Sequence, residues 1–194
     1  MWRLCNDIRR KPLPKLVDIL KEKLANDDFS FDGNIDKGRT GIQGLSINQF
    51  SRRYIYHLLA RLTAHLDAKE GNADQFDHYV DRDRENPLDI EHIWPDRYNR
   101  FSKVFDSKQE FAEARDHVGG LVLLPADVNR SLQQKPFEEK APVYAKQNAF
   151  AGSLAPGYYD HQPRLKRYRE ENNLPLKSYE HFGVKEQEER AELI

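Results

Sequence analysis

The stretch LDIEHIWP, residues 88–95, decides the expected fold because it is one of two apolar runs that can pair as strands. Ile90 and Ile93 supply the aliphatic side chains of a buried strand, and Pro95, which has no backbone N–H to donate, predicts its end. The second run, HVGGLVLLP at residues 117–125, is rich in aliphatic residues and is also closed by a proline. A helix is expected directly after it, so the predicted order is strand, long excursion, strand, helix.

Most of the remaining chain carries helical patterns. Aliphatic residues at spacings of three and four predict an amphipathic helix over 13–24. The segment SINQ, residues 46–49, predicts a capping box that opens a long helix ending near Gly71. Its expected buried stripe consists of Phe50, Tyr54, Leu58, Leu62 and Leu66. Shorter helices are expected over 107–116 with Phe111 inward, 126–134, 136–147, 164–172 and 184–194, the last with little to bury.

Three features exclude common classes of protein. The glycine-rich stretch 32–44 lacks the GK[ST] ending of a phosphate-binding loop, and we expect a surface loop there. The single cysteine, Cys5, excludes a disulfide framework and a zinc site built from paired CxxC motifs. No run reaches the roughly 18–20 apolar residues that cross a bilayer, so we expect a cytoplasmic protein that does not engage a membrane.

Charge is unevenly distributed along the chain, although the formal net charge is only -1. Residues 67–91 hold nine acidic and three basic residues, a balance of -6, which leaves +5 for the remainder. The excess positive charge includes clusters at 9–15 and 164–169. Such clusters are usually solvated faces, but they are also candidates for contacts with phosphate.

The first strand carries polar side chains as well as apolar ones. It offers Asp89, Glu91 and His92, and the helix after the second strand offers Asn129. Oxygen donors of this kind suit Mg²⁺ or Mn²⁺, and a neutral imidazole beside them suits a general base. Hydrolysis of a phosphodiester uses both, because a cation neutralises the phosphate while a base deprotonates the attacking water. Carboxylates at strand ends are nevertheless common, and a lone histidine is more often structural.

DIEHIWP, followed by HVGGLVLLPADVN and KPFEEK, resembles the HNH-like, or His-Me finger (ββα-metal), nuclease domain at the C-terminal end of GmrSD-type modification-dependent (type IV) restriction endonucleases and related antiphage defence proteins. The resemblance implies an α+β, mainly helical fold. A ββα-metal core, residues 88–149, would be embedded in a helical nuclease domain, 46–194, with C-terminal helices over 160–194. Residues 1–45 would form an N-terminal helix and loop that link to, or remain from, an upstream domain.

The resemblance also implies roles for the polar residues. His92 matches the general base that activates water. Glu91 and Asn129 match catalytic ligands of one divalent metal, Mg²⁺ or Mn²⁺. Asp89 is expected either as an additional or outer ligand, or as a strand-end acid paired with an arginine.

Basic residues near these motifs are expected to bind DNA. Lys140 matches the family lysine, and its ammonium would hold a phosphate. Arg97 and Arg100 follow the catalytic strand and would clamp the DNA backbone, and Arg130 adjoins the expected metal ligand on the next helix.

One position departs from the family pattern. Gly120 stands where the family has an asparagine, and an asparagine near there helps to orient the catalytic histidine. Either activity is reduced or another group takes that task, and Asp116 and His117 are the nearby candidates.

The expected function is that of a metal-dependent DNA endonuclease that nicks one strand, as the effector of a phage-defence or modification-dependent restriction system. Its expected partners are DNA, double-stranded and in some cases modified, and a nucleotide-hydrolysing sensor present as an N-terminal domain or a separate subunit. Two alternatives stay open: a DNA- or protein-binding module that keeps the fold without cutting, and a ribonuclease toxin.

Overall fold

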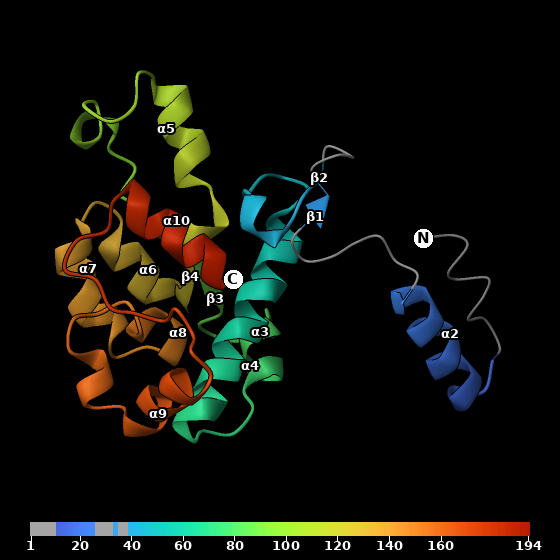
Figure 1. Cartoon of the computed structure of the whole chain (residues 1–194). Helices are drawn as coiled ribbons and strands as arrows, with labels where there is room; N and C mark the ends of the chain where they lie inside the picture. Colours follow the sequence, from blue (N-terminus) through green and yellow to red (C-terminus); the bar gives the residue numbers. More distant parts are fainter. Residues whose placement is uncertain (1–10, 26–32, 35–38) are drawn as a thin grey trace. The chain divides into compact units, whose positions relative to one another are not determined.

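The computed structural model describes residues 11–25, 33–34 and 39–194 (Figure 1). The chain forms two compact units, Met1–Gly41 and Ile42–Ile194. The boundary expected from the sequence lies four residues later, between residues 45 and 46. Arg9, Arg10 and Cys5, which were singled out in the sequence, lie outside the described residues.

The first unit contains α2 (Leu13–Ala25), which confirms the predicted amphipathic helix. It also contains two very short antiparallel strands, β1 (Gly33–Asn34) and β2 (Arg39–Thr40). The prediction of a loop over 32–44 was therefore too simple, because paired strands and the 3-10 turn η2 (Ile42–Gly44) lie within it.

The second unit is mainly helical with one two-stranded sheet, so the α+β, mainly helical class is confirmed. Its elements after η2 are α3 (Arg52–Glu70), α4 (Phe76–Val80), β3 (Leu88–His92), η3 (Tyr98–Arg100), α5 (Lys108–Arg115), η4 (Val118–Gly120), β4 (Leu121–Pro125), α6 (Ala126–Leu132), α7 (Phe137–Tyr144), α8 (Ala149–Gly152), η5 (Tyr158–Asp160), α9 (Pro163–Glu171) and α10 (Val184–Leu193). None of the helices described here is both long and apolar enough to cross a bilayer.

The sheet is built from the two apolar runs of the sequence. β3 and β4 pair antiparallel, with Leu88 opposite Pro125 and His92 opposite Leu121. Beyond the last pair, Ile93 N donates to Gly120 O at 2.9 Å. The helix α6 begins directly after β4 and packs on both strands, while α3 and α8 contact β4 (Figure 1). The predicted order of strand, strand and helix is thus present.

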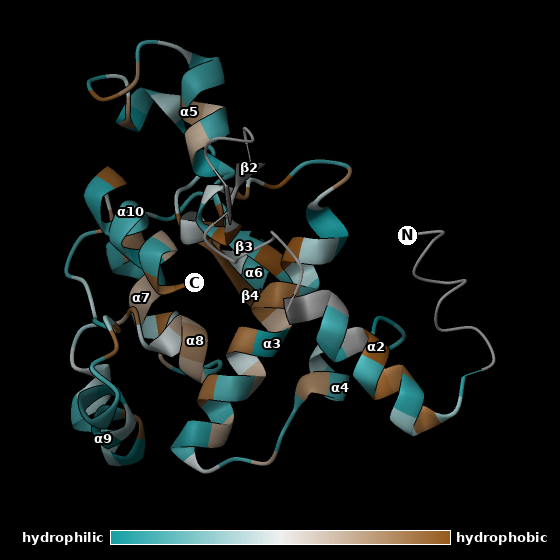
Figure 2. Cartoon of the chain, turned by 45° about the vertical axis from the view of Figure 1, so that its right-hand side comes forward, coloured by the Kyte–Doolittle hydropathy of each residue, from teal (hydrophilic) through white to brown (hydrophobic). Residues whose placement is uncertain are grey.

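The core surrounds β4, whose side chains from Leu121 to Leu124 are fully buried. Figure 2 shows this strand in the brown of hydrophobic residues at the centre of the second unit. An aromatic part of the same core gathers around Trp94 and includes Phe111 of α5, whose inward position was predicted. Trp94 Nε1 donates to Phe182 O at 2.8 Å, which ties this group to the C-terminal segment.

The long helix α3 differs from its prediction in both its start and its buried face. It begins at Arg52, after Asn48 Oδ1 has accepted hydrogen bonds from two following backbone N–H groups. Phe50 and Tyr54 are 79% and 69% exposed, so the predicted stripe is wrong there. Residues four apart advance about 40° past a full turn, so the stripe drifts off the face that packs. The buried residues are Ile55, Leu59, Ala60, Thr63, Ala64, Leu66 and Asp67.

The last helix, α10, was expected to bury little, and this was wrong. Arg190, Gln187 and Ala191 are buried against η4 and β4. Arg190 Nη1 donates to Gly119 O at 2.8 Å and to Leu121 O at 2.9 Å, and Gln187 Nε2 donates to a carbonyl at the end of α5. Backbone acceptors compensate the burial of Arg190 Nη1 and Gln187 Nε2, whereas Arg190 Nη2 is buried without a partner among the described residues.

Side chains bond the outward-facing carbonyls along both edges of the sheet. In an antiparallel pair, alternate carbonyls of each strand point away from the partner strand. On β3 the bonds run from Arg82 to Leu88, from Asn129 to Ile90 and from Lys140 to His92. On β4 they run from Arg190 to Leu121 and from Asn148 to Leu123.

Candidate active site

His92 ends β3 and is held by a carboxylate. Its Nε2 lies 2.8 Å from Asp116 Oδ1, and the two side chains are 18% and 37% exposed. Asp116 is itself fixed, because it caps the C-terminus of α5 and its carbonyl accepts from Ile47 N at 2.8 Å. A carboxylate only accepts hydrogen bonds, so Nε2 carries the hydrogen and Nδ1 of the neutral ring keeps its lone pair.

The protonation of His92 suits a base at neutral pH. Burial lowers the pKa of this imidazole below its usual value of 6.5, against the opposing effect of the hydrogen bond to Asp116. The nearby guanidinium of Arg115 also lowers the pKa. The ring is therefore mostly neutral near pH 7, the form that accepts a proton.

Gly120 is explained by packing rather than by catalysis. A Cβ at this position would lie 2.8 Å from Gln187 Nε2 of α10, so an asparagine does not fit without displacing that side chain. Of the two candidates for holding the histidine, His117 instead accepts from Gly119 N at 3.3 Å. Asp116 is the residue that contacts His92.

The Glu91 side chain is buried and hydrogen-bonded within the fold. Its Oε1 accepts from Lys140 Nζ at 2.6 Å and from Tyr144 OH at 3.0 Å, and Lys140 also donates to His92 O at 2.7 Å. Successive side chains of a strand point to opposite faces, so Glu91 faces α7 while His92 faces the end of α5. Burial raises the pKa of Tyr144 well above its usual value, and the Glu91 charge raises it further, so the phenol stays a donor.

The position of Lys140 differs from the one expected for a phosphate contact. Its side chain is 1% exposed, and its ammonium is occupied by Glu91 and the His92 carbonyl. Burial lowers the pKa of Lys140, and the Glu91 carboxylate opposes that effect. This geometry supports a role inside the fold, and it does not support contact with DNA.

The other two expected ligands also have protein partners. Asn129 Nδ2 donates to Ile90 O at 3.2 Å. Asp89 Oδ1 lies 3.2 Å from Arg82 Nη2, the pairing with an arginine that was the alternative expectation for this residue.

The donor chemistry fits a divalent ion held by few protein atoms. Within the described ranges, no three His, Cys, Asp or Glu side chains gather in a metal-binding cluster. Glu91 uses Oε1 for its cationic and phenolic partners, and Asn129 uses its amide hydrogen, so each has one oxygen without a bond to a described residue. Mg²⁺ typically takes one or two protein oxygens and completes its shell with water and substrate phosphate.

The three arginines expected at the DNA surface are exposed. Arg97 Nε donates to Gln134 Oε1, and Arg100 lies in η3 beside the exposed pair formed by Glu138 and His181. Arg130 lies on α6 and is exposed as well. None of these three arginines forms a hydrogen bond with His92.

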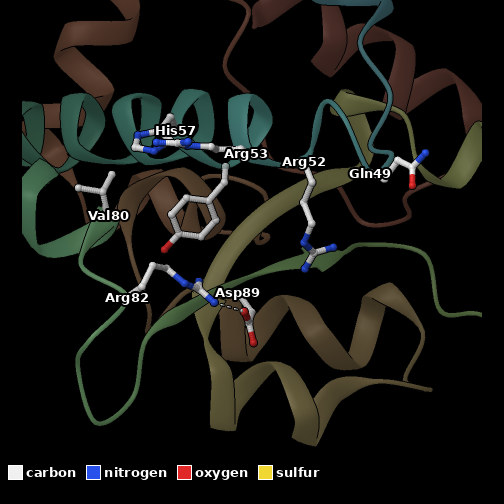
Figure 3. Close-up of a pocket in the computed structure, with 8 residues that line it drawn as sticks. Gln49, Arg52, Arg53, His57, Val80, Arg82 and Asp89 are labelled. Carbon is white, nitrogen blue, oxygen red and sulfur yellow. Dashed lines mark hydrogen bonds and ion pairs between the residues drawn. The ribbon is translucent and has the colours of Figure 1, made fainter.

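A basic cleft between α3 and β3 was missed by sequence reasoning. It encloses about 560 Å³ and is lined by Gln49, Arg52, Arg53, Tyr56, His57, Val80, Arg82 and Asp89 (Figure 3). The adjacent arginines at 52–53 were a signal in the sequence. The predicted helix, which opens at residues 46–49, placed both arginines inside a helix. Arg82 lies within the acidic segment 67–91, so no local pattern indicated a basic cleft.

In this mainly helical α+β domain a neutral histidine, held by a carboxylate, ends a buried strand, and such a pair is chemically suited to accept a proton. The comparison of sequences then identifies the family: the model described as "GmrSD restriction endonucleases, C-terminal domain" matches residues 32–193, and the chain belongs to that family. The predicted resemblance is confirmed, and membership indicates a nuclease with DNA as its substrate. No curated protein and no solved structure matches the chain.

Proposed function

We propose that this domain hydrolyses phosphodiester bonds of DNA with His92 as the general base and cuts one strand per event. The observation that carries the proposal is the 2.8 Å contact between His92 Nε2 and Asp116 Oδ1. It leaves Nδ1 as the proton acceptor of an otherwise sheltered, neutral ring. One base serves one incision, so a single domain makes a nick.

The protein's own groups prepare the base in three ways. The Asp116 carboxylate sets the orientation of the ring and stabilises the imidazolium that forms when Nδ1 takes a proton from water. Lys140 fixes the backbone of the strand end through the His92 carbonyl. The bond from Ile93 N to Gly120 O fixes the next residue.

A divalent ion, Mg²⁺ or Mn²⁺, would be held by Glu91 and Asn129, and when bound it supplies charge neutralisation at the phosphate. Asp89 is assigned an outer role because it is already paired with Arg82. Tyr144 and Lys140 would fix the orientation of the Glu91 carboxylate through its other oxygen.

The biological setting follows from the family. We propose that the domain is the effector of a phage-defence or modification-dependent restriction system, in the cytoplasm, and that a nucleotide-hydrolysing sensor domain or subunit directs it to DNA. Arg97, Arg100 and Arg130 are proposed to contact the DNA backbone, because all three are exposed.

Relaxation of supercoiled plasmid tests the proposed chemistry. With Mg²⁺ or Mn²⁺ the parent protein should produce open circles, and His92→Ala should lower the initial rate by about 10²- to 10⁴-fold, the usual contribution of a general base. His161→Ala, which removes an exposed histidine from the end of η5, is the matched control and should cut like the parent. Equal survival of supercoiled plasmid with parent and His92→Ala would refute the proposal.

A further inference from the structure

We infer that the cleft between α3 and β3 binds the DNA backbone, with Arg52 and Arg53 as its phosphate contacts. The identity of the nucleic acid rests on the proposed function, whereas the preference for an anionic strand rests on the cleft itself. The cleft opens to solvent along α3 and is bordered by α4 and by the strand that carries His92 (Figure 3).

The charge of the lining favours an anion. Its formally charged residues are three arginines and one aspartate, a balance of +2 with His57 neutral. Arg82 and Asp89 offset each other at 3.2 Å, so the positive excess comes from Arg52 and Arg53. Both side chains are exposed and extend from the first turn of α3. Figure 3 shows Arg52 reaching from that helix toward β3.

Two other side chains of the lining, Tyr56 of α3 and Arg82, are held by contacts within the fold. Tyr56 OH donates to Tyr79 O at 2.6 Å, and the Arg82 guanidinium lies 5.1 Å from the centre of the Tyr56 ring. Arg82 also donates to Leu88 O. The two exposed arginines beside these held side chains suit an extended anionic chain, since guanidinium groups bind phosphate oxygens in pairs.

The N-terminus of α3 adds to this preference. Arg52 is the first residue of a helix of 19 residues, and such an end carries partial positive charge. The contribution is secondary to that of the two guanidinium groups. It nevertheless points in the same direction, toward phosphate.

Two connections join the cleft to the candidate active site. Asp89 lines the cleft three residues before His92, a separation of about 10 Å along a strand. Gln49, at the other end of the lining, is two residues from Ile47, whose N–H bonds the carbonyl of Asp116. The Asp89 side chain lies on the strand face opposite to His92, so the contact between the cleft and the His92–Asp116 pair is the backbone bond of Ile47.

Binding of a labelled DNA duplex, followed by fluorescence anisotropy in the full chain carrying His92→Ala, tests this inference without cleavage. The double variant Arg52→Ala, Arg53→Ala should raise the Kd at least tenfold at about 0.1 M salt and reduce the slope of log K against log salt by about 2, one for each phosphate contact. The control variant Lys103→Ala, Lys108→Ala removes the same charge from exposed positions around α5. It should change the Kd by less than twofold and leave the salt slope unchanged. Replacement of both arginines by lysine should restore most of the salt slope.

Failure of the inference and failure of the proposed function give different results. If the parent nicks plasmid but the two double variants bind DNA alike, the cleft is not the backbone groove and the function stands. If the parent does not nick, while the loss of Arg52 and Arg53 alone weakens binding and flattens the salt slope, the cleft is confirmed and the nuclease proposal fails.

Discussion

His92 and Glu91 are adjacent residues with opposite surroundings. The His92 side chain bonds Asp116 and is 18% exposed, whereas the Glu91 side chain is buried between Lys140 and Tyr144. Strand geometry separates them, because each successive side chain turns to the other face. The same octet of sequence therefore supplies both the proposed base and a buried, ion-paired acid.

Asp116→Asn tests whether the carboxylate positions the base. The amide oxygen still accepts from Nε2, but it carries no charge to stabilise the imidazolium, so nicking should fall about 10- to 100-fold with KM little changed. Asp106→Asn removes an exposed carboxylate ahead of α5 and is the matched control. Initial rates over a range of DNA concentrations measure both, and equal rates for the two variants would contradict the assignment.

Lys140→Met tests the buried ion pair. It leaves the Glu91 carboxylate in the core with only Tyr144 as a partner, so the free energy of unfolding should drop by about 3–5 kcal/mol. Adding Glu91→Gln should recover part of the loss, because the remaining group is then uncharged. Urea unfolding of the two variants and the parent provides the measurement, and a Lys140→Met protein as stable as the parent would show that the pair is not formed.

At the scale of elements, the strands were predicted well and the faces of the helices less well. Each apolar run contains a strand, because aliphatic side chains fill it, but the first strand already ends at His92 and residues 118–120 of the second run form the 3-10 turn η4. The buried face of α3 and the burial of α10 depend on partners far along the chain. In α10 the side chains that become buried are a glutamine and an arginine, which no hydrophobic pattern marks as core.

The approach of α10 to η4 predicts the effect of restoring the family residue. Gly120→Asn places a Cβ at 2.8 Å from Gln187 Nε2, so it should destabilise the protein by about 1–3 kcal/mol. Combining it with Gln187→Ala should relieve most of that loss beyond the cost of Gln187→Ala alone. Thermal unfolding of the four proteins measures this coupling, and strictly additive effects would argue against the contact.

At the scale of the whole molecule, family and class could be predicted from the sequence, whereas the partners of individual side chains could not. The ordered motifs around His92 and Asn129 identify the family. The sequence did not show that Lys140 is buried, because its partner lies 49 residues earlier and only the packing of α7 against β3 brings them together. The basic cleft is likewise assembled from α3, Arg82 and Asp89, segments that no local pattern connects.

The pH dependence of global stability gives a further prediction. Burial lowers the pKa of His117 below its usual 6.5, so the unfolded chain binds this proton more readily than the folded one. The contribution of His117 to the free energy of unfolding is complete above pH about 6.5 and decreases as the pH drops below that value. His117→Asn keeps a side-chain acceptor for Gly119 N, and its Tm should fall less than that of the parent between pH about 7 and about 5.5. Parallel curves for the two proteins would contradict this.

The bonded carbonyls on the two edges of the β3–β4 sheet affect whether another chain can add a strand to it. Exposed strand edges act as templates on which a neighbouring chain can add its own strand. Here the acceptors at Leu88, Ile90 and His92 on one side, and at Leu121 and Leu123 on the other, are already engaged by side chains. These strand edges therefore offer few free acceptors to a strand from another copy of the chain.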